Sequence, residues 1–173
     1  MKKIFSFLIA ALSVCGMQSV NAQTVDFGST KVTLTEADGS GYERFQNKKQ
    51  NGGAFETIYK LDGCGLNVYS TDNQMKQDKT SLQVRNVKGT ALIIDGLKEG
   101  QTVLVKTKGL DNSGEKAKDF KVTLRHGTVT QDGKTISNYG GLEANKEFTV
   151  GAGTTYVVLQ LTKYDRVFSI SVK

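Results

Sequence analysis

The sequence predicts an all-β protein, an antiparallel β-sandwich of about ten short strands. Apolar and polar residues alternate with a period of two in many short segments, which is the pattern of a half-buried strand. The connections are built on Gly, Asn and Asp, since the chain has 19 glycines and no proline. After the N-terminal segment, no stretch with the helical period exceeds about two turns.

Residues 1–22 are predicted to be a cleaved signal peptide. Lys2 and Lys3 form a basic start, and the apolar run Ile4–Val14 follows. That run is shorter than the roughly 20 residues that a transmembrane helix needs. Val20–Ala22 then provides a cleavage point before Gln23.

Residues 23–173 are expected to form a single β-sandwich domain, because their length and apolar content suit one core. No later stretch is apolar enough for a transmembrane segment, so we expect an exported protein, periplasmic or extracellular. One alternative stays open. Leu12–Cys15 partly resembles a bacterial lipoprotein box, in which Cys15 would carry a lipid anchor.

The strands follow one another in the order of the alternating segments. They are expected at residues 25–27, 31–35, 54–61, 66–70, 81–87, 90–94, 101–107, 119–126, 147–150, 154–161 and 166–172. The side chains expected to face the core are Phe55, Tyr59, Leu61, Leu66, Val68, Leu82, Val84, Val103, Val105, Phe120, Val122, Leu124, Val157, Leu159, Leu161, Phe168, Ile170 and Val172.

The last two strands are expected to form a hairpin at the centre of the sandwich, turning at Tyr164-Asp165. Within the first of them, Tyr156, Val158 and Gln160 point away from the core. Either a loop covers these side chains or they belong to a binding surface.

Two connections stand out. Asp132-Gly133 predicts a tight hairpin, because both residues tolerate the positive φ of a type I′ turn. Glu36–Gly53 interrupts the strand pattern and is longer than most connections in compact domains. Its aromatic residues, Tyr42 and Phe45, either cap the end of the core or face a ligand.

A resemblance to a known group of proteins rests on three segments, Ile93–Val103, Tyr156–Leu161 and Arg166–Val172. A Gly-Leu-x-x-Gly-Gln corner leads into a central strand, and the chain closes on an alternating strand. In these features residues 93–173 resemble the jelly-roll, galactose-binding-like modules of secreted bacterial carbohydrate-active proteins. The resemblance implies a jelly-roll-like sandwich that binds a sugar or another cell-surface ligand, sometimes with a structural calcium ion. Aromatic platforms in that group often include tryptophan, which this chain lacks.

Carbohydrate binding requires an aromatic surface for sugar C–H groups and polar groups for the hydroxyls. The candidates with outward or loop positions are Tyr42, Phe45, Asn67, Tyr69, Tyr139, Tyr156 and Gln160. The structural alternative for each tyrosine is a buried ring whose hydroxyl reaches water.

No catalytic residue is assigned, and we do not expect an enzyme. The chain lacks HExxH, paired-cysteine, phosphate-loop and G-x-S-x-G motifs, and it has one histidine, His126. A pair of carboxylates acting in hydrolysis stays open. No cofactor is expected apart from a structural calcium ion, which also stays open. Its candidate ligands are the loop carboxylates Asp38, Glu43, Asp72, Asp78, Asp111 and Asp132.

Cys64 lies in the turn Asp62–Gly65 and is the one cysteine outside the predicted signal peptide. We interpret it as a small buried residue, with a thiol nucleophile as the alternative. The net charge of +6 is dispersed along the chain, which argues against a nucleic-acid partner. The sequence therefore favours a carbohydrate-binding module, and the alternative is a structural or adhesin-like envelope protein with a protein partner.

Overall fold

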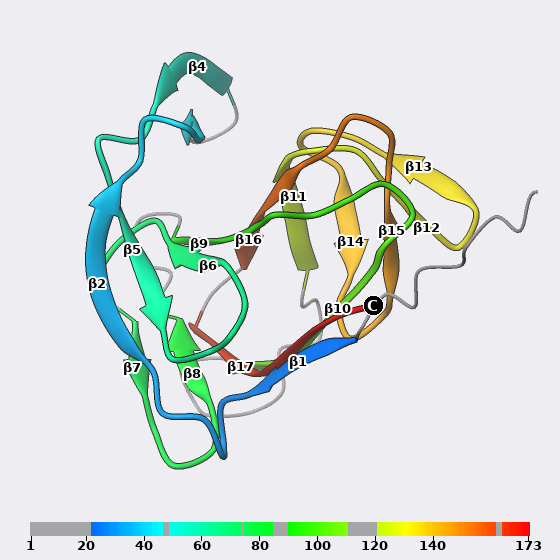
Figure 1. Ribbon diagram of the computed structural model, residues 1–173. Coiled ribbons are helices and arrows are strands. Elements are labelled where there is room, and N and C mark those ends of the chain that lie inside the picture. Colours follow the sequence, from blue (N-terminus) through cyan, green and yellow to red (C-terminus); the bar gives the residue numbers. More distant parts are fainter. Residues whose placement is uncertain (1–21, 47–48, 74, 85–89, 111–120, 162–163) are drawn as a thin grey trace, which may run out of the picture.

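The computed structural model describes residues 22–46, 49–73, 75–84, 90–110, 121–161 and 164–173. These residues form 17 strands and contain no helix. Accordingly, the described part of the chain has no helix that could cross a membrane. All strand pairs are antiparallel, and most strands belong to two large sheets (Figure 1). This confirms the all-β class and fits the predicted β-sandwich.

Sheet A has eight strands, and β17 lies at its centre between β10 on one side and β8 and β1 on the other. In spatial order its strands are β13 (Lys134–Ile136), β12 (Val129–Gln131), β15 (Phe148–Val150), β10 (Thr102–Leu110), β17 (Tyr164–Val172), β8 (Leu82–Val84) and β7 (Lys76–Gln77), with β1 (Gln23–Asp26) also paired to β17.

Sheet B has seven strands, in the order β14 (Gly141–Glu143), β11 (Lys121–His126), β16 (Tyr156–Leu161), β9 (Ala91–Asp95), β6 (Val68–Ser70), β5 (Thr57–Asp62) and β2 (Thr33–Asp38). A separate two-stranded sheet consists of β3 (Glu43–Gln46) and β4 (Lys49–Ala54). β4 lies beyond the ends of β2 and β5 (Figure 1).

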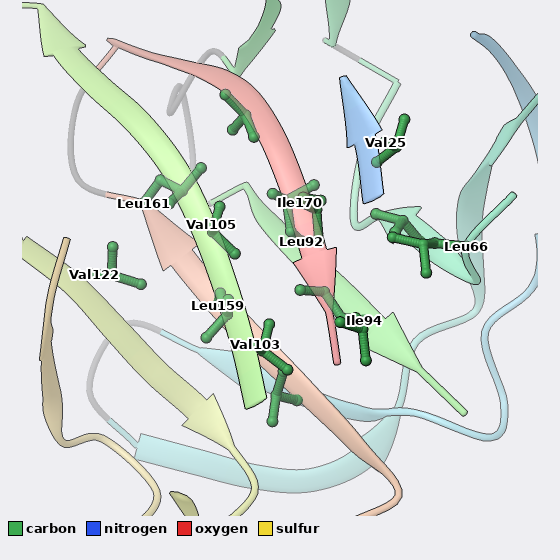
Figure 2. Packing of buried hydrophobic residues seen from close by; sticks show 14 of the residues in the cluster. Val25, Leu66, Leu92, Ile94, Val103, Val105, Val122, Leu159, Leu161 and Ile170 are labelled. Carbon is green, nitrogen blue, oxygen red and sulfur yellow. The ribbon is translucent and has the colours of Figure 1, made fainter. Parts of the chain in front are cut away.

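The main core lies between the two large sheets. Val103, Val105 and Ile170 come from β10 and β17 of sheet A, and they meet side chains of β9 and β16 from sheet B (Figure 2). Each fully buried apolar side chain contributes roughly 1.5–3 kcal/mol. The inward predictions that the structure confirms are Leu61, Leu66, Val68, Leu82, Val84, Val103, Val105, Val122, Leu124, Val157, Leu159, Leu161, Ile170 and Val172. Phe120 lies outside the described residues.

The predicted hairpin of the last two strands is wrong. β16 lies in sheet B between β11 and β9, whereas β17 lies in sheet A. Both strands are central, so the hydrogen-bonding edges of each are already occupied by other strands. The chain therefore passes from one sheet to the other between Leu161 and Tyr164.

The prediction that Phe168 lies in the core is also wrong. Ser169 pairs with Lys106 and Val167 pairs with Thr107, so Phe168 is the extra residue of a β-bulge. The bulge shifts the alternation by one residue. Val167 is fully buried in the core, and Phe168 is half-buried outside it.

Phe55 and Tyr59 do not join Leu61 in the main core either. Phe55 precedes β5 and packs against the opposite face of sheet B, because the alternation of β5 begins only at Thr57. Tyr59 is half-buried.

The residues around 36–53 are more regular than predicted. β2 continues to Asp38, and β3 and β4 pair as a hairpin. The Asp132-Gly133 turn is confirmed. Gln131 pairs with Lys134 across it, and φ is 51° at Asp132 and 72° at Gly133.

Candidate binding surface on the outer face of sheet B

A second apolar cluster lies on the outer face of sheet B, the side turned away from the main core. Ile58, Ala91, Ile93 and Val158 are buried there with no exposed surface. The outer face of a sandwich usually carries polar side chains. Here it is covered instead by the partly buried residues Ala37, Tyr42, Phe55, Tyr69 and Tyr156.

Four rings form what we call the aromatic surface: Tyr42, Tyr69, Tyr156 and His126. The Tyr42 ring lies 5.5 Å from that of Tyr69 and 5.1 Å from that of Tyr156, with the second pair edge to face. His126 stacks on Tyr156 with centroids 4.2 Å apart and planes 3° apart. All four side chains are half-buried, so each ring is supported by protein and still reaches solvent.

Strand pairing brings these residues to one place. Tyr69 is opposite Ile93, Ile93 is opposite Val158, and Val158 is opposite His126, in a row across β6, β9, β16 and β11. Tyr156 is opposite Asp95 in the neighbouring row. The surface therefore rests on four adjacent strands of the sheet.

A β-bulge gives His126 its place in this row. Leu124 pairs with Leu159 and His126 pairs with Val158, which leaves Arg125 as the extra residue. With uninterrupted alternation His126 would share the inward face of Leu124. The bulge moves it to the outer face beside Tyr156.

Hydrogen bonds attach the segment Tyr42-Glu43 to three strands of sheet B. The Tyr42 hydroxyl donates to Asp95 Oδ2 at 2.9 Å, and the Glu43 backbone N–H donates to the Tyr156 hydroxyl at 3.1 Å. The Glu43 carboxylate lies 2.7 Å from His126 Nδ1. The start of β3 is thereby fixed against β9, β16 and β11.

These surroundings favour neutral phenols. Burial raises the pKa of Tyr42, and its hydrogen bond to Asp95 raises it further. Burial likewise raises the pKa of Tyr156. The hydrogen bond from the Glu43 N–H opposes that shift, and the charges of Glu43 and Asp95 add to it. Both carboxylates therefore act on the rings of the aromatic surface.

The structure places three of the predicted site residues, Tyr42, Tyr69 and Tyr156, in the aromatic surface. Asn67 is exposed on the connection before β6 and is not part of it. Phe45 lies in β3, but its side chain is outside the described part of the structure.

Gln160 of β16 and Tyr139, in the turn before β14, belong to a second group around Arg125 of β11. Gln160 is buried and accepts a hydrogen bond from Arg125 Nε at 2.5 Å. The guanidinium of Arg125 lies 5.1 Å from the centre of the Tyr139 ring. Arg125 thus joins the two predicted residues to each other and not to the aromatic surface.

Sequence reasoning did not assign His126, Glu43 or Asp95 to the binding site. His126 was at the end of a predicted strand, and the bulge that redirects it leaves no mark in the alternation of Val122 and Leu124. Asp95 directly follows the strand predicted at residues 90–94, and nothing in the sequence pattern distinguishes it from the other turn carboxylates. The pattern predicts Glu43 only as a loop carboxylate that could bind calcium.

The candidate calcium ligands that the structure describes do not gather into one site. Among the residues that the structure describes, no group of three or more His, Cys, Asp or Glu side chains could hold a metal ion. Asp78 accepts hydrogen bonds from the N–H groups of Thr80 and Ser81 and pairs with Arg166. The Thr80 and Ser81 bonds hold the pKa of Asp78 well below its ordinary value. Asp111 lies outside the described residues.

Cys64 is buried, with 7% of its surface exposed. Its Sγ lies 3.0 Å from the carbonyl oxygens of Leu61 and Leu66. The flanking Gly63 and Gly65 have φ of 92° and 73°, as the tight turn requires. This agrees with a small buried residue at a turn.

The sequence matches no protein-family model and no curated protein.

Proposed function

We propose that the protein is an exported, non-catalytic binding module that recognises a carbohydrate through the aromatic surface of sheet B. The observation that carries the proposal is the set of four touching, half-buried rings with two carboxylates at their border. A sugar offers C–H faces for such rings and hydroxyl groups for such carboxylates.

The arrangement is preorganised for binding. The Tyr42 and Tyr156 hydroxyls are engaged by Asp95 and by the Glu43 backbone, and His126 is engaged by Glu43. Rings that are already fixed lose little conformational entropy when a ligand arrives. An apolar floor of fully buried residues supports them from below.

The proposal includes a jelly-roll-like sandwich and export. In favour of the first, consecutive strands from β8 to β17 alternate between the sheets, with β12 and β13 together in sheet A. The second rests on the basic and apolar pattern of residues 1–22. Residues 1–21, including Cys15, lie outside the described structure.

Isothermal titration calorimetry tests the binding proposal. The purified protein is titrated with a panel of neutral and charged oligosaccharides, and Tyr156→Ala and Tyr59→Ala are titrated with each one that binds. Tyr59 is also half-buried, but it is not part of the aromatic surface. We expect Tyr156→Ala to weaken binding at least tenfold and Tyr59→Ala to leave it unchanged. The absence of heat across the panel with folded protein would overturn the proposal.

A second candidate function, an envelope structural or adhesin-like protein, is favoured by one feature of sheet B. β2 is an edge strand of six residues, while the other described edge strands of the large sheets, β1, β7, β13 and β14, have two to four. A long edge is suited to adding a strand from a protein partner. Affinity purification from envelope extracts tests this, with Thr35→Pro in β2 expected to abolish capture of the partner.

A further inference from the structure

The border of the aromatic surface carries negative charge. Asp95 accepts its hydrogen bond from Tyr42, which is a neutral phenol. Glu43 faces His126, and within the described residues no lysine or arginine forms an ion pair with either carboxylate. The guanidinium of Arg125 is directed to Gln160 and Tyr139 instead.

The rings of the aromatic surface also favour a positively charged ligand. The face of a tyrosine ring is electron-rich and attracts a cation, and the attraction increases when the cation is partly removed from water. Tyr42, Tyr69 and Tyr156 present such rings next to Asp95 and Glu43. The raised pKa values of Tyr42 and Tyr156 are in the direction that a negative local potential produces, although burial is their largest cause.

We propose that the ligand is a glycan of amino sugars whose amines are free and protonated. The sugar C–H face would lie on the tyrosine rings, and an ammonium N–H would donate a charge-assisted hydrogen bond to Asp95. A glycan of uronic acids would instead bring its carboxylates against Asp95 and Glu43. This inference rests on the proposed function, since it assigns a ligand class to the same surface.

The test compares β-1,4-linked tetrasaccharides that differ at one ring position: glucosamine, N-acetylglucosamine and glucose. Calorimetry is done at pH 6, where the free amines are protonated, and at low and high salt. We expect the glucosamine tetrasaccharide to bind about tenfold tighter than the other two at low salt, and the difference to shrink at high salt because screening weakens exposed charges.

Asp95→Asn identifies the residue responsible. The amide oxygen still accepts the bond from Tyr42, so the variant removes the charge while keeping the geometry. It should weaken binding of the glucosamine ligand more than binding of the glucose ligand, and thereby abolish the advantage of the glucosamine ligand. Glu36→Gln is the matched control, because it removes one carboxylate from the exposed surface of β2. It should change nothing.

The outcomes separate the two proposals. If the glucose or N-acetylglucosamine tetrasaccharide binds as tightly as the glucosamine one, the amino-sugar inference is wrong while carbohydrate binding stands. The inference is also wrong if Asp95→Asn and Glu36→Gln weaken the glucosamine ligand equally, since the attraction is then to net charge. If no oligosaccharide of the wider panel binds the folded protein, carbohydrate binding itself is wrong.

Discussion

The ring of His126 lies parallel to that of Tyr156, with centroids 4.2 Å apart. The two residues come from neighbouring strands, β11 and β16, and face each other only because Arg125 is an extra residue in β11. The same histidine contacts Glu43 at the start of β3. The β-bulge at Arg125 therefore allows β11 of sheet B to contact the segment Tyr42-Glu43, which completes the aromatic surface.

Deleting Arg125 should remove the bulge and keep His126 on the outer face. His126 would then follow Leu124 directly, and regular alternation places successive side chains on opposite faces. Pairing with Val158 and stacking on Tyr156 are kept, whereas the hydrogen bond to Gln160 is lost. We therefore expect the deletion and Arg125→Ala to lower the free energy of unfolding by similar amounts, about 1 kcal/mol, in urea denaturation. A much larger loss for the deletion would show that the bulged backbone itself is needed to place His126.

Tyr42→Phe should loosen the attachment of β3. The variant removes the donor to Asp95, and a hydrogen bond to a charged group contributes about 1.5–3 kcal/mol. Because this site is partly exposed, we expect a loss of about 1 kcal/mol in urea denaturation. In the Asp95→Asn background the same substitution should cost less, which a double-mutant cycle measures. Additive effects would mean that Tyr42 and Asp95 are not coupled.

Alkaline pH should destabilise the protein through Tyr42 and Tyr156. Their pKa values are raised in the folded state, so their stabilising contribution is complete below the ordinary pKa of 10.0. It is lost as pH rises above that value, because the unfolded chain then binds fewer protons than the folded one. Denaturation from pH 8 to 12 should show this decline, and it should be smaller in the Tyr42→Phe, Tyr156→Phe double variant. An equally steep decline in that variant would contradict the assignment.

The thiol of Cys64 should be unreactive in the folded protein. It is buried beside two carbonyl oxygens, and a thiol in such surroundings has little access to a reagent. We expect labelling by a disulfide reagent to occur at the rate of unfolding and to be fast in urea, as followed by mass spectrometry of the Cys64 peptide. Fast labelling without denaturant would instead favour an exposed, reactive thiol.

Alternation was sufficient to predict the class of fold and most of the core. Val103, Val105, Val122 and Leu124 lie where a period of two places them. The wrong predictions concern β-bulges and the pairing of strands. The extra residue in β17 places Val167 in the core where Phe168 was expected. The local pattern also does not say whether β16 pairs with β17 or with strands far away in sequence. Strands of two or three residues, such as β7 and β14, are too short to show a period, which is one reason why the described residues form 17 strands where about ten were expected.

The aromatic surface was predictable only in part. Tyr69 and Tyr156 were recognisable as outward residues on strands, and Tyr42 as an isolated loop aromatic. Their meeting depends on non-local pairing and on the hydrogen bonds of Glu43, neither of which the sequence pattern contains. The need to cover the outer face of β16 was nevertheless visible, and Tyr42 helps to cover it.

The central claim is that the aromatic surface binds a glycan of amino sugars. Nuclear magnetic resonance of the protein during titration tests it most directly. The ring signals of Tyr42, Tyr69, Tyr156 and His126 are assigned and followed as the glucosamine tetrasaccharide is added, with Tyr59 as an internal reference. The account predicts saturable shifts in the four rings of the aromatic surface and none at Tyr59. Shifts confined to other residues, or no shifts at millimolar ligand, would contradict it.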